Sequence, residues 1–205
     1  MTMKVLGLDE VGRGSIAGPL VFGAVVLDKP IAGLKDSKML SARQRQILAK
    51  KIYYQATATY LGWVSAHELD RVGLSQALRL AAARALHGFS LSVELLVLDG
   101  NINYLPSGFN PITLIGGDKL EPAVSAASII AKVARDTYMI NQANTYPQYG
   151  FDKHVGYCTR AHVEALQRYG VCPLHRCTFE PIKTLLGGNR QLSHLYPVAS
   201  TTPAR

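Results

Sequence analysis

Acidic residues follow three apolar runs of this sequence. Asp9 and Glu10 close the run that begins at residue 4, and Asp99 and Asp118 follow the runs 93–98 and 112–115. If these runs are strands of one sheet, neighbouring strands lie about 4.8 Å apart and carboxylates at their ends can converge. Converging carboxylates repel one another unless a cation holds them, and hard divalent cations prefer oxygen ligands. Two such ions can promote hydrolysis of a phosphodiester, although each acid alone could equally be a turn or cap residue.

A glycine-rich turn follows the first acidic pair. Gly12 and Gly14 flank Arg13. Glycines let a backbone approach a sugar closely, and exposed amides can hydrogen-bond a 2′-hydroxyl. Arg13 could bind a phosphate in a forked geometry, and a tight turn with a solvated arginine is the alternative. A nucleotide-binding loop fits poorly, because residues 12–18 lack the lysine of a Walker loop and the dinucleotide-binding spacing.

Composition agrees with a nucleic-acid partner without proving one. The chain of 205 residues carries 22 Lys and Arg against 14 Asp and Glu, a net charge of +8, which attracts polyanions. Hydrophobic residues make up 48%, as in a folded domain. The N-terminal residues resemble no secretory signal and no apolar run is long enough to span a membrane, so we expect no membrane association.

Cysteines and histidines gather near the C-terminal end of the folded region. They are His154, Cys158, Cys172, His175 and Cys177. Their spacing matches no regular zinc pattern, so we interpret the cysteines as small buried apolar residues. Three cysteines cannot form a closed disulfide framework, which indicates a reducing cytoplasm.

Periodicity and capping signals predict the elements that position these residues. Strands are expected at residues 4–9, 20–27, 56–64, 93–98 and 112–115, the last two both buried, and helices at 73–89, 122–144 and 159–169. Ser41 with Gln44 and Ser65 with Glu68 match the capping box that opens a helix. The order predicts an α/β fold with a mixed central sheet flanked by helices. We expect a catalytic core at 1–140, a helical C-terminal extension at 141–186 and a flexible tail at 187–205.

Ordered motifs across residues 4–182 resemble the ribonuclease HII family. The matching segments are Asp9-Glu10-Val11-Gly12-Arg13-Gly14 with Ala17-Gly18-Pro19, Asp36-Ser37-Lys38-Met39-Leu40-Ser41, Leu98-Asp99-Gly100-Asn101, Gly117-Asp118 with the helix 125–136, Tyr149-Gly150-Phe151-Asp152-Lys153-His154 with Gly156-Tyr157, and His175-Arg176. Each motif is short, but the ordered set is specific. Ser15-Ile16 stands where the family more often has Pro-Leu, and neither position is a ligand.

The resemblance implies a ribonuclease H-like fold with a helical C-terminal extension. It also implies that Asp9, Glu10, Asp99 and Asp118 are catalytic acids that bind Mg²⁺ or Mn²⁺. The expected substrates are RNA/DNA hybrids and duplex DNA with embedded ribonucleotides, cut by a monomer.

The resemblance further implies that Gly12, Arg13, Gly14 and Tyr157 sense the junction between a ribonucleotide and the following deoxyribonucleotide. Lys38 and Lys153 are the basic residues that we favour for backbone contacts, since they lie in loops near the motifs. Lys132, Arg135 and Arg160 are weaker candidates, and Asp136 could hold a basic neighbour in place.

Two alternatives remain. A catalytically silent nucleic-acid-binding module would have no use for four clustered anions beside phosphate. The sister family ribonuclease HIII carries Lys at the position of Arg13 and usually an N-terminal extension.

Overall fold

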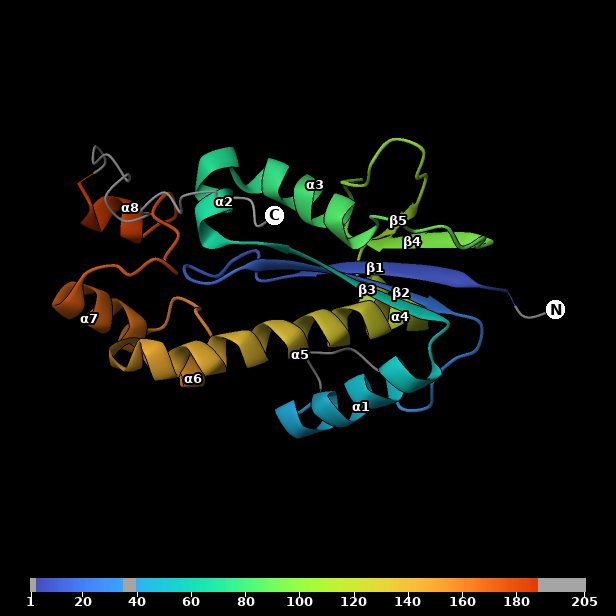
Figure 1. The fold of residues 1–205 in the computed structure, drawn as a ribbon, viewed down its shortest axis with the longest axis horizontal. Coiled ribbons are helices and arrows are strands. Elements are labelled where there is room, and N and C mark those ends of the chain that lie inside the picture. Colours follow the sequence, from blue (N-terminus) through green and yellow to red (C-terminus); the bar gives the residue numbers. More distant parts are fainter. Residues whose placement is uncertain (1–2, 35–39, 188–205) are drawn as a thin grey trace, which may run out of the picture.

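A mixed five-stranded sheet forms the centre of the molecule. The structure, a computed structural model, describes residues 3–34 and 40–187. The strands are β1 (Val5–Val11), β2 (Leu20–Leu27), β3 (Ala58–Val64), β4 (Leu95–Asp99) and β5 (Ile112–Leu114), and they lie in the order β3-β2-β1-β4-β5. β1 pairs antiparallel with β2 and parallel with β4 (Figure 1). The predicted mixed sheet is therefore confirmed, with β1 at its centre.

Helices cover both faces of this sheet. They are α1 (Ala42–Gln55), α2 (Ala66–Val72), α3 (Leu74–Ala85), α4 (Gly117–Leu120), α5 (Pro122–Thr145), α6 (Phe151–His154), α7 (Arg160–Tyr169) and α8 (Ile182–Leu185), with a 3₁₀ turn η2 at Pro147–Tyr149. α1 and α5 lie on one face, and α2 and α3 on the other (Figure 1). Each face has its own apolar cluster, because alternate residues of β1 point to opposite sides.

Local capping chemistry begins three helices where the sequence predicted it. The hydroxyls of Ser41 and Ser65 accept hydrogen bonds from the backbone of Gln44 and Glu68, whose side chains bond back to the cap residues. The hydroxyl of Thr159 caps α7 by accepting one hydrogen bond from the backbone amide of His162. Satisfying these otherwise unpaired amides stabilises each helix start, so the predictions at these positions are confirmed.

Two expectations about the last strand were wrong. Residues 112–115 were expected to form a buried strand that places Asp118 at its end. Instead β5 is an edge strand of three residues, and Ile112 is 56% exposed. Asp118 lies beyond it, in the first turn of α4, after the Gly116-Gly117 turn. β5 has a pairing partner on one side only, so its apolar residues are not enclosed as a central strand would be.

α5 is the long element that connects the sheet to the C-terminal helices. It packs closely on β1 at Gly7, where an added Cβ would stand 2.0 Å from the carbonyl carbon of Ala123. The helix runs through residue 140 without a break, across the expected boundary between core and extension. None of the helices in the described part of the chain has the length and apolar character that a membrane-spanning segment requires.

Candidate active site

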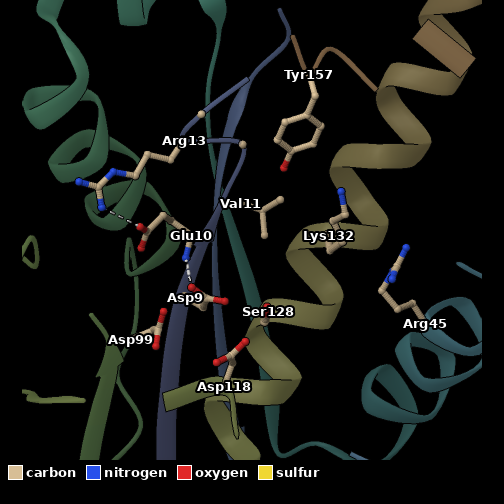
Figure 2. Close-up of a pocket in the computed structure, with 12 residues that line it drawn as sticks. Asp9, Glu10, Val11, Arg13, Arg45, Asp99, Asp118, Ser128, Lys132 and Tyr157 are labelled. Carbon is tan, nitrogen blue, oxygen red and sulfur yellow. Dashed lines mark hydrogen bonds and ion pairs between the residues drawn. The ribbon is translucent and has the colours of Figure 1, made fainter. Parts of the chain in front are cut away.

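Four acidic side chains face one open cleft near the carboxyl ends of β1 and β4. The cleft has a volume of about 420 Å³ and is lined by Asp9, Glu10, Val11, Gly12, Arg13, Gly14, Arg45, Asp99, Asp118, Ser128, Lys132 and Tyr157. The acids gather on one side of it, whereas Tyr157, Lys132 and Arg45 approach from the other side (Figure 2). The structure therefore brings together all four acids that the sequence singled out.

Strand pairing explains why the acids of distant segments meet. β1 and β4 are parallel neighbours in which Leu8 is opposite Leu98, so the next residues, Asp9 and Asp99, come at the same level of the sheet. The backbone amide of Gly117 donates a hydrogen bond of 2.7 Å to Oδ1 of Asp99. This bond holds the start of α4, and with it Asp118, against the end of β4.

The cluster disfavours full ionisation of its own members. Burial, and then the negative charges of Glu10 and Asp99, raise the pKa of Asp9 well above its usual value, although a hydrogen bond with Ser128 opposes the shift. Burial and Asp99 also raise the pKa of Glu10, against the opposing charge of Arg13. A buried anion next to other anions is stabilised by a proton or a cation. The cleft is thus an electrostatic site for positive charge.

The donor set fits a hard divalent cation. Carboxylate oxygens are the ligands that Mg²⁺ and Mn²⁺ prefer, and one strand pair plus α4 supplies all four. Among residues 3–34 and 40–187, no group of three or more Asp, Glu, His or Cys side chains lies close enough together to hold a metal ion as it stands. The fit of the site to such a cation rests on its oxygen donors and on their negative charge.

The glycine-rich loop after β1 presents its backbone to the cleft. Gly14 is exposed, with no atom within 4 Å of where a Cβ would stand. Arg13 is also exposed and lies 3.4 Å from a carboxylate oxygen of Glu10. Two buried arginines hold the loop from behind: Arg135 donates to the carbonyls of Ala17 and Pro19, and Arg176 to those of Arg13 and Gly18.

Tyr157 enters the same cleft from the segment between α6 and α7. Its ring is 5.1 Å from Nζ of Lys132 and 5.5 Å from the guanidinium carbon of Arg135. Lys132 also pairs with Asp136 at 2.9 Å, which agrees with the interpretation that Asp136 holds a basic neighbour in place. The aromatic face and the loop therefore lie at one site.

One of the two basic residues that we favoured, Lys153, does not line the cleft. Lys153 lies on α6 beside a separate surface hollow, and Lys38 lies outside the described residues. Lys132 and Arg45 line the cleft instead. Lys132, one of the less favoured candidates, stands four residues after Ser128, a spacing that places both on one face of α5. The sequence contains no comparable signal for Arg45.

The cysteines and histidines of the C-terminal segment do not form a metal site. Cys158 is exposed while Cys172 and Cys177 are buried, and all three are free thiols. The ring nitrogens of His162 and His175 hydrogen-bond to each other and to the backbone. Nitrogens that are engaged in this way are not available as zinc ligands.

Comparisons with known proteins agree with this geometry. The family model for Ribonuclease HII matches residues 6–182. Ribonuclease HII of Nitrosococcus oceani is 46% identical over 186 residues, covering 89% of this chain and 92% of the relative. That of Desulforamulus reducens is 45% identical over 185 residues, with 89% and 92% covered.

A solved structure has the same fold. Ribonuclease H2 from Pyrococcus horikoshii superposes with a TM-score of 0.77 at 28% identity, covering 91% of this chain and 98% of that one. With 91% of this chain covered, the likeness extends over most of the sheet and of the C-terminal helices. The chain belongs to the ribonuclease HII family and is a ribonuclease H endonuclease.

Proposed function

We propose that this endonuclease hydrolyses the RNA strand of RNA/DNA hybrids and nicks duplex DNA on the 5′ side of embedded ribonucleotides. One observation supports the finer part of this proposal: the four acids, the exposed backbone of Gly14 and the ring of Tyr157 line a single cleft. A site that both cleaves phosphodiesters and reads a sugar needs these groups side by side. In the cell, such an activity would remove ribonucleotides from DNA during replication and repair.

We propose Asp9, Glu10, Asp99 and Asp118 as the residues that hold Mg²⁺ or Mn²⁺. When bound, the cations would supply Lewis-acid activation of the attacking water and charge stabilisation at the scissile phosphate. The protein's own contribution is orientation. The amide of Gly117 fixes Asp99, and the amide of Glu10 donates to Oδ1 of Asp9 at 2.7 Å. Carboxylates held in this way need little rearrangement when charge develops.

The opposite wall of the cleft would bind the substrate. Amides of the Gly12–Gly14 turn could hydrogen-bond the 2′-hydroxyl of the ribonucleotide, because Gly14 has no side chain to keep the sugar away. Tyr157 would pack on the following deoxyribose, which an added 2′-hydroxyl would disturb. Lys132 and Arg45 would contact phosphates, and Arg13 would exchange its contact with Glu10 for one.

Other features remain part of the proposal. One is the division into a core at 1–140, an extension at 141–186 and a tail at 187–205. The helix α5 runs across the first of these boundaries without a break. A monomer suffices, because one chain supplies all four acids. Free thiols at all three cysteines suit the reducing conditions of the cytoplasm.

Cleavage of duplex DNA that contains one ribonucleotide, with and without Mg²⁺, tests the proposal directly. We expect metal-dependent nicking that leaves a 3′-hydroxyl and a 5′-phosphate, because water attacks phosphorus and the 3′-oxygen leaves. Attack by the 2′-hydroxyl would give a cyclic phosphate instead. Asp99→Asn should remove the activity without unfolding the protein. Binding without cleavage by the wild type would contradict the proposal.

Tyr157 provides the test of junction reading. Tyr157→Ala should lose more kcat/KM on a single embedded ribonucleotide than on a continuous RNA/DNA hybrid, where no deoxyribose follows the cut. The ratio of the two kcat/KM values separates lost discrimination from general damage. Tyr157→Phe, which keeps the ring, is the matched control and should preserve the ratio. An unchanged ratio in Tyr157→Ala would remove Tyr157 from substrate discrimination.

A further inference from the structure

A cluster of three histidines lies directly behind Tyr157. His154 and His162 stack with ring centroids 4.3 Å apart, and the rings of His162 and His175 are 5.2 Å apart. His162 and His175 are completely buried, and the aromatic rings of Tyr149 and Phe151 pack against the cluster. Buried polar groups are normally hydrogen-bonded, so the hydrogen bonds of these two histidines indicate which part of the structure they position.

Hydrogen bonds determine which nitrogen of each ring carries the proton. The backbone N–H of Cys172 donates to Nδ1 of His175 at 2.8 Å, so His175 is protonated on Nε2. His175 Nε2 donates to Nε2 of His162 at 3.1 Å, which leaves His162 protonated on Nδ1. His162 Nδ1 then donates to the backbone carbonyl of Tyr157 at 2.9 Å. The two histidines form a directed chain that ends on Tyr157.

Both histidines are neutral in this chain of hydrogen bonds. Burial, together with the charge of a neighbouring histidine, lowers the pKa of His162 to about 4 and that of His175 to about 3. Neutrality is what the chain requires, since His162 must accept one hydrogen bond and donate another.

The segment that carries Tyr157 is also joined to the glycine-rich loop. The carbonyl of Gly156 accepts hydrogen bonds from the amides of Ile16 and Ala17 at 3.0 and 3.1 Å. Gly156 has a φ of 87°, and an added Cβ would stand 2.3 Å from the carbonyl oxygen of Ala17. The backbone before Tyr157 is thus tied to the loop, and the backbone after it is tied to the histidines.

We propose that His162, oriented by His175, is a positioning residue that sets Tyr157 against the Gly12–Gly14 turn and so determines selectivity for the ribonucleotide–deoxyribonucleotide junction. The inference rests on the proposed role of Tyr157. Apart from its bond to His175, the hydrogen bond to the Tyr157 carbonyl is the only one that the ring of His162 makes to the described residues. A ring that served only to fill the core would not need this bond.

Two variants of His162 separate tethering from packing. His162→Phe keeps a planar ring beside Phe151 but cannot donate to Tyr157. His162→Asn retains an N–H group close to the position of Nδ1. Leu78→Ala, in the buried cluster beneath α3, is a control for general destabilisation. The measurement is the ratio of kcat/KM on a single embedded ribonucleotide to kcat/KM on a continuous hybrid.

We expect His162→Phe to lower this ratio by roughly three- to ten-fold, which is the worth of one ordinary hydrogen bond. His162→Asn should recover part of the loss, and Leu78→Ala should leave the ratio unchanged. Long-range ¹H–¹⁵N spectra of the wild type provide a second readout that needs no variant to fold. They should show a proton on Nδ1 of His162 and on Nε2 of His175 at pH 7.

The possible failures are distinguishable. If Tyr157→Ala lowers the ratio and a folded His162→Phe does not, the positioning role is overturned while the proposed function stands. If Tyr157→Ala leaves the ratio unchanged, junction reading by Tyr157 fails and the positioning role fails with it. A proton on Nε2 of His162, or a charged His162 at pH 7, would overturn the directed chain whatever the kinetics.

Discussion

Arg135 should contribute more to stability than any exposed arginine of this protein. Its guanidinium is completely buried and donates three hydrogen bonds of 2.9 Å, to the carbonyls of Ala17, Pro19 and Val155. These bonds join α5 to the glycine-rich loop and to the segment before Tyr157. Arg135→Met keeps the length and the apolar stem of the side chain and removes all three bonds.

The expected cost follows from burial. Each hydrogen bond from a charged donor contributes about 1.5–3 kcal/mol, and two buried carbonyls and one partly buried carbonyl would lose a partner. Removing the charged group also relieves the cost of burying it, which is several kcal/mol. We therefore expect a net loss of about 3–5 kcal/mol in the free energy of unfolding. At roughly 2–4 °C per kcal/mol for a chain of this size, Tm should fall by about 6–20 °C.

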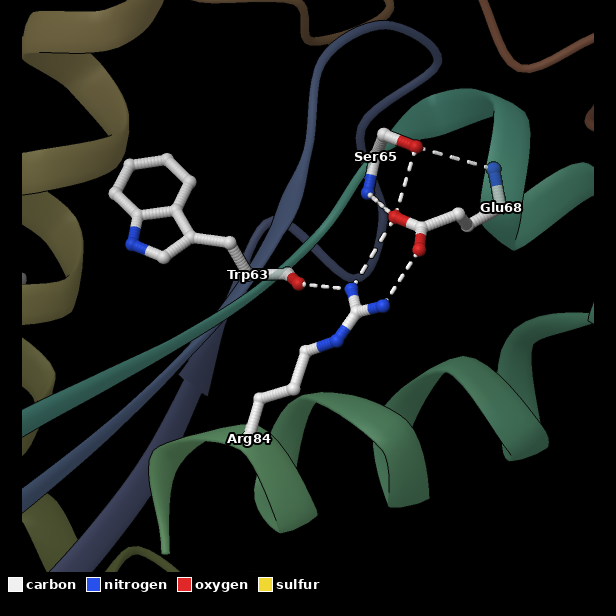
Figure 3. Close-up of polar contacts among 4 residues, drawn as sticks. All are labelled: Trp63, Ser65, Glu68 and Arg84. Carbon is white, nitrogen blue, oxygen red and sulfur yellow. Dashed lines mark hydrogen bonds and ion pairs between the residues drawn. The ribbon is translucent and has the colours of Figure 1, made fainter. Parts of the chain in front are cut away.

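Arg84 offers a matched control on the surface. Its guanidinium also donates three hydrogen bonds, to the carbonyl of Trp63 at 2.6 Å and to the carboxylate of Glu68 at 2.6 and 3.2 Å (Figure 3). The side chain is 41% exposed, however, so water can replace each lost bond. Arg84→Met should cost less than about 1 kcal/mol, because exposed ion pairs contribute little.

Thermal unfolding of both variants without added metal measures the difference. Arg135→Met should also lose activity on both substrates, since the loop that it supports faces the acids. Equal losses of Tm in the two variants would refute the argument, because they would show that the number of hydrogen bonds matters here and their burial does not.

Four further predictions concern charge. Asp9→Asn should abolish cleavage yet raise Tm in metal-free buffer by roughly 2–4 °C for each kcal/mol of repulsion relieved. The pKa of Asp9 is raised in the folded state, so Asp9 stabilises the fold below pH 3.8 and this stabilisation is lost as pH rises. The gain in Tm of Asp9→Asn over the wild type should therefore grow from pH 4 to pH 7. A gain in Tm that stays constant over this range would contradict the prediction. Lys132→Ala should weaken binding to all duplexes alike and reduce the slope of log affinity against log salt by about 0.9, without moving the cut. Lys38→Ala should behave in the same way if Lys38 contacts phosphate, and a shifted cut would make either lysine a specificity residue. The free energy of unfolding of the wild type should fall as pH drops from 6.5 towards 4, because the folded pKa of His162 lies near 4; His162 alone accounts for about 3 kcal/mol of this fall. His175 and His154 face His162, and their lowered pKa values act in the same direction. Melting curves of His162→Phe should show a smaller fall over the same pH range.

Local chemistry within the sequence was sufficient for much of the fold. The capping boxes at Ser41 and Ser65 and the apolar run at Leu20–Leu27 use bonds or burial patterns that adjacent residues specify. The ordered motifs also singled out the four acids that line the cleft, because these carboxylates and their flanking glycines occupy neighbouring positions in the chain. These features could be predicted since no distant contact decides them.

Tertiary structure decided which other residues share the cleft. Arg45 lines it and Lys153 does not, because the docking of α1 and α6 on the rest of the molecule sets those distances. Asp118 reaches the acids through a bond from Gly117 to Asp99, eighteen residues earlier in the chain. His162 and His175 meet across thirteen residues inside a buried cluster. Strand order and helix docking depend on burial of apolar surface between segments that are far apart in the chain. The periodicity of one segment does not indicate which other segment it packs against.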